Sequence, residues 1–281
     1  MHKFILGTFF LLSSALCAAA QLNNAEALSE ARQTRLEMLI QQRAERAAQE
    51  QIGKRDVRTA ASAAAIGDSD VGEASSFNKN AKFFGTATAG FVVLDPVCDP
   101  VALDLGPDDR CLNVSNPAVT ASATFNDIGR ISLPGKQADN VIYLIANHST
   151  SFVFQNTDAS PVSGLLTYSP SITIESDALN DPAAIDPNTG LPMNGSYTTT
   201  GLGTKSSNRT LAPFSIDVQT ESYSRANTNG LSRTFWASLG LPNSVINQLY
   251  KKPMTIRLNV RVSARRVESG VFIFSTRLLA N

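Results

Sequence analysis

The sequence predicts a mainly β protein, an antiparallel β-sandwich or a barrel-like variant of one, preceded by an amino-terminal helical arm. From residue 81 onward, short segments rich in Val, Ile, Phe and Thr follow one another, each bounded by Gly, Pro, Asn, Asp or Ser. No long helical segment separates them, so neighbouring strands are expected to pair antiparallel in packed sheets. A third observation, the helix-forming composition of residues 21–66, predicts the arm.

The first twenty residues have the form of a secretory signal peptide. Lys3 supplies the positive start, residues 4–17 form an apolar run, and three alanines precede Gln21. The run is shorter than the roughly 20 apolar residues that a membrane-spanning helix needs. We therefore predict cleavage after residue 20, export to the periplasm, cell surface or extracellular space, and no transmembrane segment in the mature chain.

Residues 21–66 form the predicted arm, which contains no proline and only one glycine, Gly53. Its apolar stripe is too thin to stabilise an isolated helix, so the arm is expected to dock on the rest of the chain, to pack on another copy, or to fray. The stripe consists of Leu28, Leu36, Leu39, Ile40, Ala44 and Ala47. Residues 67–80 read as a linker, and 81–281 as the β-sandwich domain.

The expected strands cover residues 82–94, 119–125, 141–147, 151–156, 165–168, 171–176, 214–222, 254–264 and 270–279. In the seventh, Phe214, Ile216 and Val218 share one face and alternate with polar residues. One late helix is expected over 244–250, capped by Asn243 and stopped by Pro253.

His148 is the only histidine that remains after signal cleavage. It stands between the expected strands 141–147 and 151–156, a spacing that predicts a hairpin with His148 at its solvated tip. A Ser-His-Asp hydrolase would depend on this residue, and no G-x-S-x-G element surrounds any serine. We therefore predict no catalytic residue. The remaining enzymatic alternative is a histidine-independent hydrolase that uses paired carboxylates.

Two cysteines, Cys98 and Cys111, remain in the exported chain, and an even pair in an oxidising compartment predicts one disulfide. A zinc site is disfavoured because one histidine and an oxidised cysteine pair do not make four ligands. The segment around the cysteines is rich in carboxylates, which calcium prefers, although the spacing does not match an EF-hand loop and ordinary turn chemistry also explains it. The candidate calcium ligands are Asp95, Asp99, Asp104, Asp108 and Asp109. No other cofactor is indicated.

Charge is unevenly distributed in a chain whose formal net charge is zero. Residues 81–200 contain twelve acids and four bases, whereas residues 201–281 contain eleven bases and three acids. Such opposite halves favour association through complementary surfaces, either between copies or within one folded molecule. They disfavour nucleic-acid binding, because the acidic half would be repelled.

The expected strand 254–264 places three arginines, Arg257, Arg261 and Arg265, at every fourth position on the face opposite its apolar residues. Guanidinium groups in such a row suit carboxylates, anionic sugars or phosphates. An ordinary solvated sheet face is the alternative. A turn at 268–270 is expected to return the chain along the last strand.

Together these features predict an exported structural or adhesive component of the cell envelope or of a surface assembly. Self-association through the arm and the complementary acidic and basic faces, or binding to an envelope protein, is the expected mode. The alternative is a carbohydrate- or envelope-polymer-binding module that uses Trp236 or Tyr223 as a stacking platform.

Overall fold

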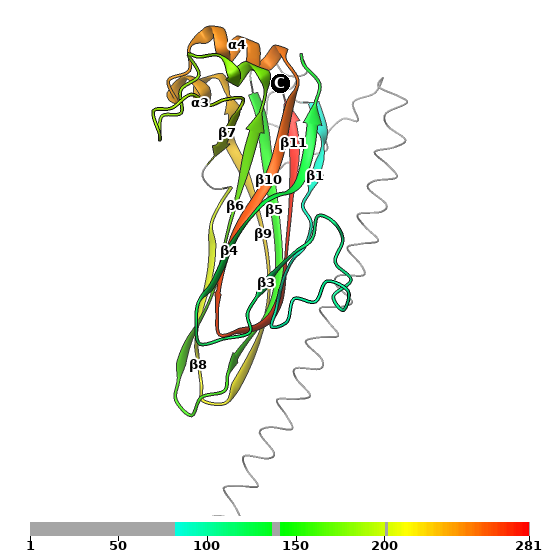
Figure 1. Cartoon of the computed structure of the whole chain (residues 1–281), viewed down its shortest axis with the longest axis vertical. Coiled ribbons are helices and arrows are strands. Elements are labelled where there is room, and N and C mark those ends of the chain that lie inside the picture. The colour runs from blue at the N-terminus through cyan, green and yellow to red at the C-terminus, as the bar shows by residue number, and fades with distance from the viewer. Residues whose placement is uncertain (1–81, 137–140, 200–201, 281) are drawn as a thin grey trace, which may run out of the picture.

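The computed structural model describes residues 82–136, 141–199 and 202–280, which form two β-sheets packed face to face (Figure 1). Sheet A has the strand order β3-β2-β11-β5-β9, with β1 also paired to β11. Sheet B has the order β4-β10-β6-β7, with β8 also paired to β6. All strand pairs are antiparallel except β2 with β3. The predicted β-sandwich is confirmed; the arm, signal peptide and linker lie outside the described residues.

Strands such as β5, β6, β9 and β11 are longer than the segments that the sequence suggested, whereas β2, β3 and β7 have four residues each. Their bounds are β1 Lys82–Thr88, β2 Val92–Asp95, β3 Arg110–Asn113, β4 Ala121–Leu133, β5 Val141–Asn156, β6 Val162–Glu175, β7 Ser196–Thr199, β8 Lys205–Leu211, β9 Ser215–Ser232, β10 Met254–Arg265 and β11 Val267–Ala280. Two pairs of expected strands are therefore the single strands β5 and β6, and β6 runs through Pro170 without a break. The single strand expected over 82–94 is instead divided into β1 and β2.

Short helices gather at one end of the sandwich (Figure 1). Helix α4 (Asn243–Lys251) is the predicted one, and it ends just before Pro253 as expected. Asn243 is its first residue and not its cap, since the cap position is occupied by Pro242 without a side-chain hydrogen bond. Helix α3 (Arg233–Ser238) and the 3₁₀ turn η2 (Asp177–Asn180) were not predicted, because elements this short contain too few turns to show a period.

The core lies between the sheets, and on strands such as β6 and β10 the buried residues mostly alternate with outward-facing ones. On β10 the buried positions are Ile256, Leu258, Val260, Val262 and Ala264, the apolar face that the sequence predicts. The largest side chains that are fully buried are Trp236, Tyr168, Phe152, Phe154, Phe272 and Phe274. Burial of these large side chains together with the aliphatic core residues stabilises the fold.

The hairpin predicted around His148 is wrong, because β5 is one continuous strand through that position. His148 pairs with Phe274 of β11 on one side and with Tyr223 of β9 on the other. The polar stretch between the two apolar runs looked like a loop in sequence. Within the sheet it is a strand interior, in which His148 is only 2% exposed and faces the other sheet.

Strand β9 does not bury the apolar face that the sequence shows at Phe214, Ile216 and Val218. Phe214, just before the strand, and Val218 are 53% and 47% exposed. The polar face instead meets strand β8 of the other sheet, where Ser207 Oγ donates to Glu221 Oε1 at 2.6 Å and Lys205 Nζ lies 3.8 Å from Glu221 Oε2. The two sheets are therefore joined along this edge by polar contacts.

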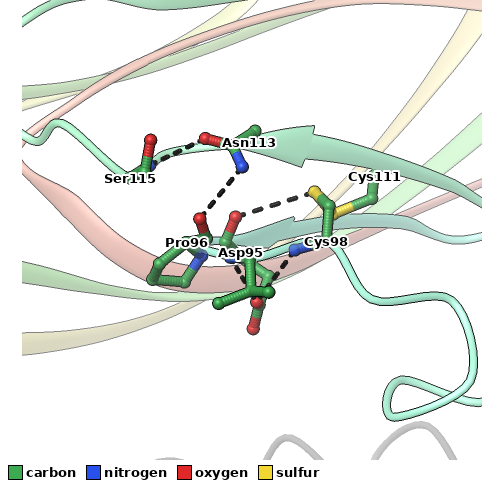
Figure 2. Close-up of a disulfide and its surroundings, with 7 residues drawn as sticks. Asp95, Pro96, Cys98, Cys111, Asn113 and Ser115 are labelled. Carbon is green, nitrogen blue, oxygen red and sulfur yellow. Dashed lines mark hydrogen bonds between the residues drawn. A yellow bond between two sulfur atoms is a disulfide. The ribbon is translucent and has the colours of Figure 1, made fainter.

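A disulfide-closed loop covers part of the outer face of sheet A. Leu103 and Leu105 of the loop pack on a small apolar cluster formed by Phe91, Val93 and Val271. Cys98 and Cys111 are bonded, with a Cα–Cα distance of 5.7 Å, so the predicted disulfide is confirmed (Figure 2). Within the described part of the chain, no helix combines the length and apolar character needed to cross a membrane.

Candidate binding surface on sheet B

The outer face of sheet B is a continuous polar surface, called here the hydroxyl face. Because alternate side chains of each strand fill the core, the remaining ones project outward, and on these strands they are mostly Ser and Thr. Many are paired across neighbouring strands by hydrogen bonds of 2.8–3.2 Å. The pairs are Ser122 with Ser263, Ser132 with Thr255, Thr167 with Ser206, Ser169 with Thr204, and Thr173 with Thr198.

The arginine row lies on this face along β10, as the sequence predicts. Arg257, Arg261 and Arg265 alternate along the strand with the core positions, and residues four apart on a strand are separated by about 13 Å. The turn that follows is earlier than predicted. It occurs at Arg266, whose φ is +59°, between the end of β10 and the start of β11.

Arg257 is held by carboxylates of its own chain. It forms an ion pair with Asp127 of β4, and its Nε lies 2.8 Å from Glu175 Oε1 of β6. The hydrogen bond to Glu175 and the nearby charge of Asp127 raise the pKa of the Arg257 guanidinium above its ordinary value, against a smaller desolvation effect. Arg257 is therefore a structural cation that ties β10 to both neighbouring strands.

A β-bulge in β4 places Asp127 at this position. The register between β10 and β4 shifts between Leu258 and Val260, and Asp127 adopts a positive φ of 53°. Its backbone N–H donates to Asn259 Oδ1 at 2.9 Å, and its carboxylate also accepts from Arg130 at 2.7 Å. The bulge was not predicted, because nothing in the local sequence distinguishes it from a regular strand.

Arg261 and Arg265, called here the arginine pair, differ from Arg257. Arg261 is exposed, and neither arginine forms an ion pair with any carboxylate in the described ranges. The Nε of Arg265 is buried without a hydrogen-bond partner among the same residues. Guanidinium groups that lack an internal counter-ion on an otherwise paired polar surface are the feature best suited to bind a carboxylate from outside.

His148, in contrast, is enclosed between the sheets. Its ring lies 5.2 Å from that of Phe274, 5.6 Å from Tyr223 and 5.8 Å from Tyr168. Neither ring nitrogen has a hydrogen-bond partner in the described structure, and burial lowers the pKa of His148 to about 4. It is thus a neutral core residue at pH 7.

The aspartates proposed as calcium ligands mostly organise the loop backbone. Asp95 Oδ1 accepts from the N–H groups of Val97 and Cys98 at 3.0 and 3.3 Å, and the Cys98 contact lies beside the disulfide in Figure 2. Asp99 caps Val101 in the same way. These are ordinary Asx turns.

Asp109 is buried and accepts from the backbone N–H groups of Phe91 and Gly106, both at 2.8 Å, whereas Asp104 and Asp108 are exposed. Across the described ranges, no group of three or more His, Cys, Asp or Glu side chains is placed to hold a metal ion. The calcium prediction therefore gains no support from the geometry of this loop.

The two aromatic residues suggested as sugar platforms do not lie on the surface as expected. Trp236 is fully buried, with Phe235 5.1 Å and Tyr197 6.0 Å away between ring centroids. Tyr223 is half-buried and directs its ring toward His148. Burial therefore excludes sugar stacking on Trp236, whereas Tyr223 is partly exposed.

Comparison with known proteins gives no family. No family model matches the chain, and no curated protein matches its sequence. Solved structures give faint similarity to the VP2 subviral particle of infectious bursal disease virus, with a TM-score of 0.17 and 8% identity over 58% of this chain and 33% of that one. The Gx strain of the same virus gives 0.15 and 11% over 58% and 32%. The chain spans about a third of the length of those chains, and a similarity this low supports no conclusion about fold or function.

Proposed function

We propose that this protein is a structural subunit of an exported surface assembly and that it joins the assembly through the arginine pair on the hydroxyl face. The observation that supports the proposal is the contrast along one strand. Arg257 is neutralised by two carboxylates of its own chain, whereas Arg261 and Arg265 have none among the described residues. The proposed partner surface therefore bears carboxylates.

The pairing of other charges supports the same assignment. Arg266 binds Asp158 at 2.6 Å, and Arg257 binds Asp127 and Glu175, so basic residues of the carboxyl-terminal half already meet acids of the preceding half within one molecule. These opposite charges are paired inside the fold. The arginine pair is what remains available on this face for a second molecule.

The arm is proposed to reinforce this contact between copies through its apolar stripe. A thin stripe needs another surface to cover it, and two weak contacts on one chain act together through their high effective concentration. The arm belongs to the proposal on the basis of its sequence, through Leu36 and Leu39 in particular.

The test is sedimentation velocity of the mature chain, residues 21–281, and of the double variant Arg261→Ser with Arg265→Ser. We expect the unaltered protein to form oligomers at low salt and the double variant to sediment mainly as monomer. Lys251→Glu, an exposed charge change on α4 at the far end, is the matched control and should associate normally. An unaltered protein that is monomeric at all concentrations would overturn the proposal.

A further inference from the structure

We infer that the arginine pair of one copy binds the disulfide loop, residues 98–111, of a second copy, an inference that rests on the proposed function and names its partner. The contact is heterologous: the hydroxyl face of one molecule meets the outer face of sheet A of the next. Contacts of this kind propagate into rings or filaments and do not stop at a dimer.

The loop carries the chemistry that the arginine pair needs. Asp99, Asp104 and Asp108 are exposed along it, and the Asp108 carboxylate accepts no hydrogen bond from the described residues. Val97, just before the loop, is 74% exposed and Val101 is 87% exposed. Exposed valines beside carboxylates suit arginine, whose aliphatic stem packs on apolar surface while the guanidinium binds oxygen.

The loop is also rigid enough to serve as a binding element. The disulfide closes it, Asp95 and Asp99 fix its turns, and Leu103 and Leu105 anchor it to the apolar cluster on sheet A. A segment already fixed in its bound shape loses little conformational entropy on association. The same features explain why valines remain exposed there: the loop has its own anchors and does not need them for folding.

The two surfaces belong to the outer faces of different sheets. The loop packs on the outward side of β2 and β11 in sheet A, and the arginine pair projects from the outward side of β10 in sheet B. No ion pair joins the loop to the arginine pair among the described residues. The partner inferred for the arginine pair is therefore the loop of a second copy.

The two surfaces lie at the same level along the sandwich. Arg261 precedes the turn at Arg266 by five residues, and Val271, on which the loop packs, follows it by five. Five residues of strand correspond to about 16 Å, so both sites are a similar distance from the turn. Stacking of copies through their sheet faces then brings loop and arginine pair together without a large shift along the strands.

Charge reversal tests the contact, with sedimentation velocity of full mature chains as the measurement. Arg261→Glu and Asp108→Lys should each weaken self-association at least about tenfold, since each places like charges in contact. A chain carrying both changes should recover association, because its reversed face again meets a reversed loop. Both positions are exposed, so circular dichroism and thermal unfolding should be unchanged in each variant.

Mixing the two single variants gives a second readout. The reversed face of the Arg261→Glu variant fits the reversed loop of the Asp108→Lys variant, and the unaltered face of the second variant fits the unaltered loop of the first. We therefore expect each variant alone to associate weakly and the mixture to form oligomers in which the two variants alternate. Asp177→Arg, an exposed reversal at the start of η2, is the matched control and should behave as the unaltered protein.

The experiments distinguish a failure of the loop contact from a failure of the proposed function. If Asp108→Lys associates normally and the double variant gives no recovery while Arg261→Glu is monomeric, the loop is not the partner and the proposed function stands. If the unaltered protein does not self-associate but binds an anionic polysaccharide column, and Arg261→Glu does not bind it, the partner of the arginine pair is an anionic polymer and not a second copy. If no variant changes association, both the inference and the arginine-pair docking are overturned.

Discussion

His148 illustrates how one residue can be polar in sequence and structural in the fold. Rings of β6, β9 and β11 surround it: Tyr168, Tyr223, Phe272 and Phe274. Desolvation also raises the pKa of Tyr168 to about 12, with a contribution from the nearby Glu221 charge, so the tyrosine stays neutral as well. Burial thus favours the neutral form of both His148 and Tyr168.

The burial of His148 predicts acid sensitivity. Its pKa is lowered from 6.5 in the unfolded chain to about 4 in the folded one. As pH falls, the unfolded state therefore takes up the proton at a higher pH than the folded state does. The contribution of neutral His148 to the free energy of unfolding is fully present above pH 6.5 and declines as pH falls toward 4, by up to about 3 kcal/mol. The measurement is the free energy of urea unfolding from about pH 7.5 to about pH 4, for the unaltered protein and His148→Leu.

In His148→Leu this part of the acid sensitivity should disappear, because leucine does not titrate and fills a similar volume. Carboxylates titrate in both proteins, so the difference between the two pH profiles isolates the histidine. A difference that stays constant across that pH range would contradict the assignment of His148 as a neutral core residue.

Asp127 holds the β-bulge of β4 in place on the hydroxyl face through its ion pairs with Arg130 and Arg257. We expect Asp127→Ala to cost about 1–2 kcal/mol, because alanine loses the ion pairs and tolerates a positive φ poorly. Asp127→Asn should cost less, since asparagine accepts that backbone conformation. Urea unfolding of both variants at neutral pH measures the difference; equal costs would show that the backbone conformation is unimportant.

At this scale, the sequence predicted what depends on residue type and simple alternation. The cysteine pair and the outward placement of Arg257, Arg261 and Arg265 needed only compartment and strand period. The ion pairs of Arg257 and the burial of Trp236 could not be predicted from the sequence, because both depend on residues that are distant in the chain.

Among the elements, the disulfide loop is fitted closely against the start of β2. A Cβ added at Gly90 would lie 2.0 Å from the Asp108 carbonyl oxygen and 2.9 Å from the Asp109 nitrogen. Gly90→Ala should displace the loop and cost about 1–3 kcal/mol, measured by thermal unfolding. Gly106→Ala, whose added Cβ would meet only the Asp109 side chain at 3.2 Å, should cost less.

The disulfide itself should contribute both stability and binding competence. Replacing Cys98 and Cys111 by serine opens a loop with a sequence separation of 13 residues, which costs up to about 3 kcal/mol in the unfolding free energy. We also expect weaker self-association, because the loop loses its preformed shape. A variant that unfolds at a lower urea concentration, yet self-associates normally where it is still folded, would show that loop rigidity is irrelevant to the contact.

The length and faces of the elements were the least predictable part of the fold. The polar middle of β5 resembled a turn because Asn147, Ser149 and His148 are all polar. Pairing on both sides keeps the strand continuous, and only the three-dimensional structure supplies those partners. On β9 the alternation of polar and apolar residues was predicted correctly, but the predicted apolar side faces outward. The polar side faces inward because strand β8 offers it the polar partners Lys205, Ser207 and Arg209.

For the whole molecule, the opposite charges of the two sequence halves serve two purposes in this account. Some pair internally and join strands, as Arg266 does with Asp158. Others remain on opposite faces of the sandwich, where the arginine pair and the exposed aspartates of the disulfide loop are available to different neighbours. Exposed charge pairs weaken as salt screens them, so assembly through these faces should be salt-sensitive even though folding is not.

The most direct measurement is the light-scattering mass of the mature protein, residues 21–281, over a range of concentrations at low and high salt. We expect oligomers that grow with concentration at low salt and dissociate toward the monomer mass at high salt, while circular dichroism stays unchanged. A protein that has the monomer mass under every condition would contradict this expectation, as would oligomers that are equally large at low and high salt.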